Sequence, residues 1–162
     1  DHYFFSKYSQ EFKELFHSIK YENNKQLLYS FSKILQLQIK DSSFLNFDYF
    51  LCVPYHKRRL HDRGFDILKI LFSFLESNYN LKPLTLLKRK KSTNRLASQS
   101  KLKRYSLVKD AFEVQNVNFK PNSSILIVDD IVTSQATMKS IIYELEKISN
   151  IESISCLSII RV

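Results

Sequence analysis

The sequence predicts an α/β protein built on a mostly parallel sheet flanked by helices, and three observations carry that prediction. Apolar strand-like runs alternate along the chain with stretches whose apolar residues recur at helical spacing. Residues 124–130 (SILIVDD) form a continuous apolar run before two acids, which is typical of a central parallel strand covered on both faces. No repeat and no linker rich in Pro, Gly or Ser divides the 162 residues, so we expect a single domain over residues 1–162.

The first quarter of the chain is predicted to be helical. Apolar residues at helical spacing indicate helices over residues 8–20 and 24–39, so residues 1–45 are expected to form a helical N-terminal part. Residues 46–54 then predict a buried strand, which Pro54 ends because proline cannot donate to a sheet ladder.

The middle of the chain is predicted to contain a helix and two short strands. Gly64, the only glycine, precedes a helix whose apolar stripe runs through residues 65–75. Short strands are expected at residues 84–87 and 111–114, and the polar, basic segment 88–107 between them predicts a surface loop.

The last third predicts the centre of the sheet. The strand at 124–130 is followed by an amphipathic helix whose apolar positions run from Met138 to Ile148. A final strand is expected at residues 153–160.

Composition indicates a folded protein without a membrane span. The chain is 44% hydrophobic, with 13 Phe and 9 Tyr, which is enough to bury a core, and no apolar run approaches the ~20 residues of a transmembrane helix. Cys52 and Cys156 lie in apolar strand-like runs, so we expect free, buried thiols in a reducing cytoplasm and no metal site through His or Cys.

The net charge of +9 favours phosphates, nucleotides or nucleic acid as partners. The charge is concentrated, because ten Lys or Arg and no acidic residue occur between Glu76 and Asp110. A solvated basic loop that only keeps the protein soluble is the simpler alternative for this region.

Asp129 and Asp130 follow the central strand at the edge where open parallel sheets bind their ligands. If the chain leaves the strand there, both carboxylates can turn toward one crevice and accept hydrogen bonds from hydroxyls or hold a metal ion. The next residues precede a helix and combine three hydroxyl side chains with backbone N–H groups, an arrangement suited to phosphate: Thr133, Ser134, Gln135, Ala136 and Thr137.

Acids followed by a phosphate loop predict a ligand that carries vicinal hydroxyls at one end and a phosphate at the other, as a ribose 5-phosphate does. The alternative is that the acids merely end a strand and that Thr133 or Ser134 caps a helix. We favour the sugar-phosphate interpretation because both features occur within fourteen residues, from 125 to 138.

Three segments resemble known sequences in the same order along residues 47–160. The first is ILIVDDIVTSQAT (125–137), which resembles the phosphoribosyl-pyrophosphate (PRPP) motif of type I phosphoribosyltransferases. The others, VPYHKRRLHDRGFDILKIL (53–71) and KLKRYSLVKDAF (101–112), are similar to segments of the ComF competence-protein family. The chain is therefore identified as similar to ComF proteins, which implies a type I phosphoribosyltransferase-like fold and an association with DNA uptake in natural transformation.

The resemblance implies roles for particular residues. Asp129 and Asp130 would hold the ribose hydroxyls, directly or through Mg²⁺, and residues 133–137 would hold the 5-phosphate. The pyrophosphate side would be formed by Tyr55, His56, Lys57 and Arg58. A flexible loop that closes over the site or binds nucleic acid would contain Lys88, Arg89, Lys90, Lys91, Arg95 and Arg104.

The sequence departs from the family pattern in its phosphate loop. Gln135 stands where the family has glycine, and a left-handed conformation there would cost about 1 kcal/mol or more. Asp66 and Leu107 also replace asparagines that the family has at these positions, and the family's four-cysteine zinc module does not occur in this sequence.

Three functions remain open at this stage. One is a phosphoribosyltransferase, in the glycosyltransferase class, that displaces pyrophosphate from PRPP; no strong general base is evident, so the catalytic residue is unknown. Another is a competence factor that binds PRPP, or a related phosphorylated ribose, without turnover. The third is a protein that binds single-stranded DNA through residues 88–104, in company with other DNA-uptake proteins.

Overall fold

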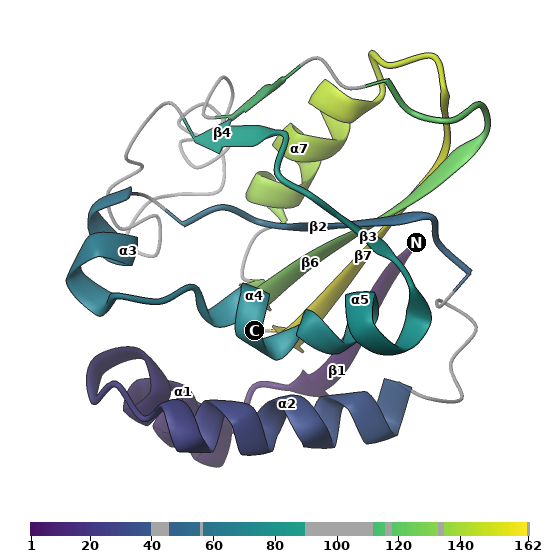
Figure 1. Ribbon diagram of the computed structural model, residues 1–162. Helices are drawn as coiled ribbons and strands as arrows, with labels where there is room; N and C mark the ends of the chain where they lie inside the picture. The colour runs from purple at the N-terminus through teal and green to yellow at the C-terminus, as the bar shows by residue number, and fades with distance from the viewer. Residues whose placement is uncertain (40–45, 56, 90–111, 116–117, 133–134, 162) are drawn as a thin grey trace.

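The computed structural model describes residues 1–39, 46–55, 57–89, 112–115, 118–132 and 135–161. Its centre is a five-stranded sheet with the order β1-β7-β6-β2-β3, in which every pair of neighbours is parallel (Figure 1). The strands are β1 (His2–Lys7), β2 (Tyr49–Cys52), β3 (Lys82–Leu84), β6 (Ser123–Val132) and β7 (Ile151–Arg161). The predicted α/β class with a parallel sheet and flanking helices is confirmed.

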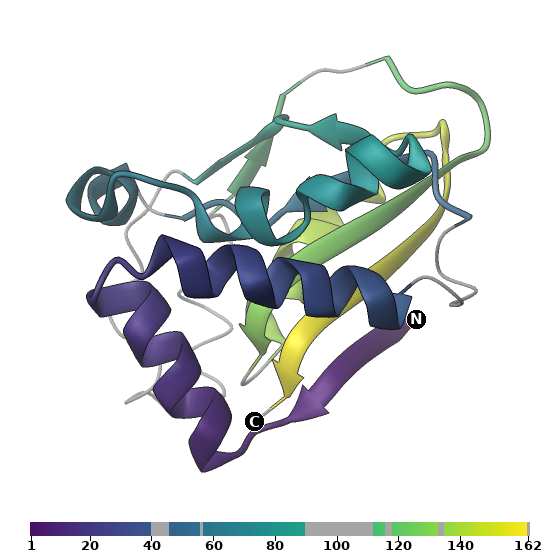
Figure 2. The same ribbon diagram turned by 60° about the horizontal axis from the view of Figure 1, so that its bottom comes forward.

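Helices cover both faces of the sheet (Figures 1 and 2). On one face lie α1 (Gln10–Tyr21), α2 (Lys25–Ile39), α4 (Ile67–Leu71) and α5 (Ser73–Tyr79). The opposite face carries α7 (Ala136–Leu145) and a small antiparallel pair, β4 (Leu87–Arg89) with β5 (Phe112–Val114). Helix α3 (Lys57–Arg63) extends beyond the carboxyl end of β2. Among the described helices, none combines the length and apolar composition that a bilayer crossing requires.

Local signals explain where several helices begin and end. The Ser9 side chain caps α1 by accepting a hydrogen bond from the Phe12 N–H group, and Asp66 caps α4 in the same way from Lys69. Gly64 has φ +76° and its N–H group donates to the carbonyl of Leu60 at 2.8 Å, which ends α3. The single glycine therefore stands where the chain needs a left-handed residue.

The structure differs from the sequence predictions at four places. Residues 1–45 were expected to be helical, but β1 also belongs to them and pairs with β7 at the edge of the sheet. The helix predicted over 65–75 is divided at Phe72 into α4 and α5. In place of one strand at 84–87 there are two, β3 and β4, which belong to different sheets.

The fourth difference concerns the central strand. β6 extends to Val132 because its pairing with β7 continues to Val132 opposite Arg161, beyond the acids that were expected to leave the strand. The pairing of β6 with β2 ends earlier, at Val128 opposite Cys52. β2 and β6 therefore stop pairing immediately before Asp129.

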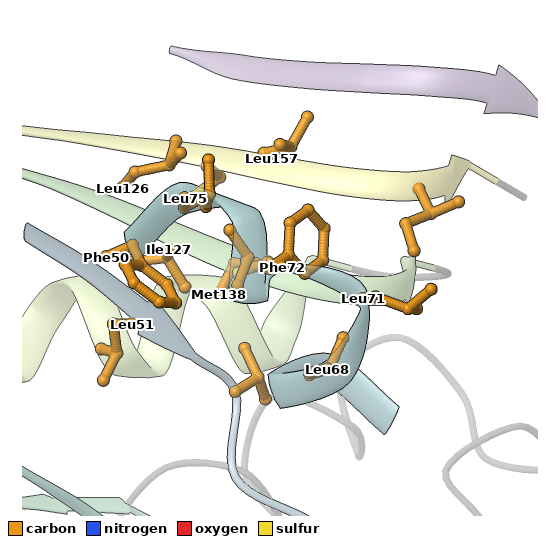
Figure 3. Packing of buried hydrophobic residues seen from close by; sticks show 14 of the residues in the cluster. Phe50, Leu51, Leu68, Leu71, Phe72, Leu75, Leu126, Ile127, Met138 and Leu157 are labelled. Carbon is orange, nitrogen blue, oxygen red and sulfur yellow. The ribbon is translucent and has the colours of Figure 1, made fainter. Parts of the chain in front are cut away.

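One core fills both sides of the sheet. Side chains of β6 and β7 are buried against helices on each face, in agreement with the continuous apolar run of the central strand. Figure 3 shows Phe72, Leu71 and Leu75 from the α4–α5 region in the same cluster as Leu126 and Ile127 of β6. Phe72 is fully buried, so the break between α4 and α5 is a packing point of the core.

Candidate functional site

The order of the strands reverses between β2 and β6. From β2 the chain moves outward to β3 through α3, α4 and α5, whereas from β6 it moves the other way to β7 through α7. In open parallel sheets, ligands bind outside the carboxyl ends of the strands at such a switch point. The segment after β2, the end of β6 and the start of α7 all meet this edge, so the structure brings most of the described candidate residues to one region (Figure 1).

The Asp130 side chain points to the face of the sheet that carries α1, and both of its carboxylate oxygens have partners there. Its Oδ2 atom forms an ion pair with the Lys20 ammonium and accepts a hydrogen bond from the Tyr55 hydroxyl at 2.8 Å. Its Oδ1 atom accepts the N–H group of Ile131 at 2.7 Å. The exposed fraction of the side chain is 9% for Asp130 and 18% for Lys20, so this is a largely buried ion pair.

The surroundings of Asp130 favour its ionised form. Burial by itself raises the pKa of a carboxyl, but the charge and hydrogen bond of Lys20, together with the Tyr55 hydroxyl, outweigh burial and lower the pKa of Asp130 below its usual value. Burial and the adjacent Asp130 charge raise the pKa of Tyr55 well above 10, so its hydroxyl stays protonated and donates.

Asp129 differs from its neighbour in how readily its carboxyl group ionises. The two residues are neighbours on β6, and their carboxyl groups interact with each other through both charge and side-chain contact. Within the described residues, the hydrogen-bond partner of the Asp129 side chain is the N–H group of Asp130, at 2.8 Å. Burial, and then the charge of Asp130, raise the pKa of Asp129 well above its usual value. The pair therefore combines one fixed carboxylate with one that takes up a proton readily.

The segment after β2 supplies an aromatic and a guanidinium group. Arg63 lies 5.3 Å from the Tyr55 ring centroid and its Nε donates to the Lys20 carbonyl at 3.4 Å. Its Nη1 atom is buried and has no hydrogen-bond partner in the part of the chain that the structure describes. Such a buried donor is unusual and is available to an anionic ligand. Tyr55, which was expected on the pyrophosphate side, links this segment to Asp130 through its hydroxyl.

The helix α7 begins after a residue in a left-handed conformation. Gln135 has φ 53° and ψ 0°, a left-handed conformation, and no side chain caps the helix. This conformation favours glycine, so Gln135 carries backbone strain. Ala136 is buried and Thr137 is half-buried in the first turn of α7.

Replacing Gln135 with Gly is expected to raise the free energy of unfolding by up to about 1 kcal/mol, because glycine adopts a left-handed conformation without strain although it loses more backbone entropy on folding. Gln135→Ala keeps the strain and is expected to leave stability within about 0.5 kcal/mol of wild type. Urea unfolding of both variants measures the difference. If the glycine variant is less stable than the alanine variant, Gln135 is not strained.

Some predicted residues are not part of the described site. His56, Thr133, Ser134, Lys90, Lys91, Arg95 and Arg104 lie outside the described residues, and so do the side chains of Arg58 and Arg89. Lys57 begins α3 and Lys88 lies on β4, both with exposed side chains.

Lys20 and Arg63 had no predicted role as site residues. Lys20 follows Phe16 by four residues on α1 and follows the buried Ile19 directly, so it stands at the edge of an apolar stripe. A lysine at such a position either pairs with a buried acid or extends into solvent past the core. Its position beside an apolar stripe was therefore the sequence signal that could have indicated a buried ion pair.

The acidic pair does not fit a protein-held metal ion. Asp130 is already neutralised by Lys20, and the described residues contain no group of three or more His, Cys, Asp or Glu that suits a metal. Cys52 and Cys156 are free thiols, and burial raises the pKa of Cys156 to about 11 and that of Cys52 still further. Neither is a thiolate near neutral pH.

A cavity of about 400 Å³ adjoins the site on the β3 side of the sheet. Its walls are mainly apolar, from β2, β3 and Leu60, and polar groups of Asp66 and Lys69 reach it from α4. Tyr55 lines this cavity and also holds Asp130, so the cavity and the acidic pair share one side chain.

Together these features define a class: a parallel α/β protein with an acidic pair and a left-handed helix entry at the switch point of its sheet. Compared with known proteins, the chain matches no family model, and no curated protein is similar to it in sequence.

Proposed function

We propose that this protein binds PRPP, or a related phosphorylated ribose, at the edge of the sheet between β2 and β6. The observation that carries the proposal is that Asp129, on β6, is followed six residues later by the left-handed entry to α7 at the switch point of a parallel sheet. The carboxylate suits the ribose hydroxyls, and the free N–H groups of the first turn of α7 suit the 5-phosphate. The unpartnered Nη1 atom of Arg63 adds a buried donor for an anionic ligand.

The proposal extends to the family that the three sequence segments resemble. In that reading the protein is ComF-like, has a type I phosphoribosyltransferase-like fold, and serves DNA uptake in natural transformation in the cytoplasm. Magnesium enters as the counter-ion of the ligand's own pyrophosphate, because Asp130 is neutralised by Lys20.

If the protein is also a transferase, its contribution is positioning. Asp129 would hold the ribose hydroxyls and α7 the 5-phosphate, so that C1 is held in place while an acceptor displaces pyrophosphate. The cavity beside Tyr55 is large enough to receive part of an acceptor. Among the described residues we assign none as the general base.

Asp129→Asn is expected to weaken PRPP binding by about tenfold to a hundredfold, because the amide is a poorer acceptor than a carboxylate for two hydroxyls. Asp129 is the better test because Asp130 is also needed for the ion pair with Lys20. Calorimetric titration of PRPP with Mg²⁺ measures the change. Glu152→Gln, an exposed carboxylate on β7, is the matched control and should bind as the wild type does.

The pH dependence provides a second readout of the same variant. Since the pKa of Asp129 is raised, its ionised fraction keeps growing as the pH increases above the usual carboxyl value of 3.8. The affinity ratio of wild type to Asp129→Asn should therefore grow with pH, and the ratio cancels the titration of the ligand's phosphates. Equal affinities of the two proteins across this range would refute the proposed site. Binding of single-stranded DNA with steep salt dependence, without PRPP binding, would favour the nucleic-acid alternative.

A further inference from the structure

The carboxylate of Asp130 has little capacity left for another ligand. An ionised carboxylate offers about four lone-pair positions. Three of them are taken, since Oδ2 contacts the Lys20 ammonium and the Tyr55 hydroxyl, and Oδ1 accepts from Ile131. A metal ion that bound Asp130 would have to displace one of these groups.

Lys20 lies near the end of α1, and the packing of this helix holds the residue beside Asp130. α1 is capped at Ser9 and buries Phe16 and Ile19 in the core. The Lys20 ammonium lies 5.1 Å from the centroid of the Phe16 ring, and the Lys20 carbonyl accepts a hydrogen bond from Arg63. The backbone and the ammonium of this residue are thus both held, which lowers the entropy cost of keeping the charge in place.

The surroundings also oppose a hydrated divalent ion. Magnesium gives up its water reluctantly and usually keeps several water molecules when proteins bind it. Asp130 has an exposed side-chain fraction of 9%, and a metal ion there would stand beside the ammonium of Lys20 with like charge. The charge of Asp130 is therefore balanced by Lys20 without a metal ion.

We propose that the Lys20 ammonium is the permanent counter-ion of the acidic pair and excludes divalent metal ions from Asp130. A consequence, which rests on the proposed function, is that a phosphorylated ribose is recognised by the carboxylate of Asp129 directly and not through a metal ion held by the protein. Lys20 is then a positioning residue, because it acts through Asp130.

Binding of Mn²⁺ alone tests the exclusion, because free Mn²⁺ gives an electron paramagnetic resonance signal that is lost on binding. Wild type and Asp130→Asn should take up Mn²⁺ equally weakly, and so should Lys20→Arg and the exposed α1 control Lys13→Met. Lys20→Met should bind Mn²⁺ about tenfold more tightly or better, and Lys20→Met/Asp130→Asn should lose this gain.

Two results would overturn the inference. One is Mn²⁺ binding by the wild type that Asp130→Asn removes, a comparison that does not require Lys20→Met to fold. The other is folded Lys20→Met, judged by circular dichroism, that binds Mn²⁺ no more tightly than the wild type.

Titration of ribose 5-phosphate separates this inference from the proposed function. If both hold, wild-type affinity is the same in Mg²⁺ and in EDTA. Affinity that requires Mg²⁺ contradicts the inference and leaves the proposed function standing. Absence of any binding contradicts the proposed function, and the Mn²⁺ result then still decides the role of Lys20.

Discussion

Lys20→Met is expected to lower the free energy of unfolding by about 3 to 5 kcal/mol at neutral pH, because it leaves the buried carboxylate of Asp130 without its counter-ion. The remaining donors, from Tyr55 and Ile131, place the expected value toward the lower end of this range. Urea unfolding followed by circular dichroism measures the loss. The exposed α1 control Lys13→Met should change stability by no more than about 0.5 kcal/mol.

The loss in Lys20→Met should shrink in acid. The pKa of Asp130 is lowered in the folded wild type, so its ion pair contributes stability that is present above the usual carboxyl pKa of 3.8 and lost as the pH falls through the folded value. Without Lys20, Asp130 is protonated more readily and the penalty in the variant is relieved as the pH falls toward 3.8. The two unfolding free energies should therefore converge in acid.

The double variant Lys20→Met/Asp130→Asn separates the cost of an unpaired charge from lost packing. Removing both charges should recover most of the stability, because a neutral amide keeps the hydrogen bond from Tyr55 without the buried charge. A double variant as unstable as Lys20→Met would mean that the ammonium acts through packing against Phe16 and not through Asp130.

Phe72→Ala is expected to cost about 3 to 5 kcal/mol, the usual range for an aromatic ring removed from a core. Phe72 is fully buried between α4 and α5, with its ring 6.3 Å from that of Phe74. The loss opens a cavity beside the central strand, where regular structure on both sides limits collapse (Figure 3). Urea unfolding measures the change.

Leu37→Ala on α2 is the control for this substitution, because its side chain is 72% exposed. It should change the free energy of unfolding by no more than about 0.5 kcal/mol. If Phe72→Ala costs as little as the control, the junction of α4 and α5 is not a packing point of the core.

Much of the fold was predictable from local pattern. The apolar run at 124–130 and the helical spacing at 24–39 correspond to β6 and α2, because burial on two faces and burial on one stripe leave distinct periodicities. β1 was not predicted, although its sequence HYFFSK is rich in aromatics. A short edge strand depends on its pairing with β7, and that pairing leaves no local signal.

Some residues of the candidate site could likewise be predicted from the sequence, and others could not. Asp129 and Gln135 could be chosen from the sequence because the acids follow an apolar strand and the hydroxyl-rich segment that contains Gln135 precedes a helix. Lys20 and Arg63 could not, since their contacts with Asp130 and Tyr55 join segments far apart in the chain.

The sequence by itself determined the parallel α/β class and the presence of an acidic pair in the central strand just before a helix, because each depends on residues within one short segment. Only the tertiary structure decided that the pairing of β2 with β6 ends just before Asp129, and that Asp130 is neutralised from α1. The physical reason is that charge pairing and burial depend on distances across the fold, and these arise only when α1, β2 and β6 pack together.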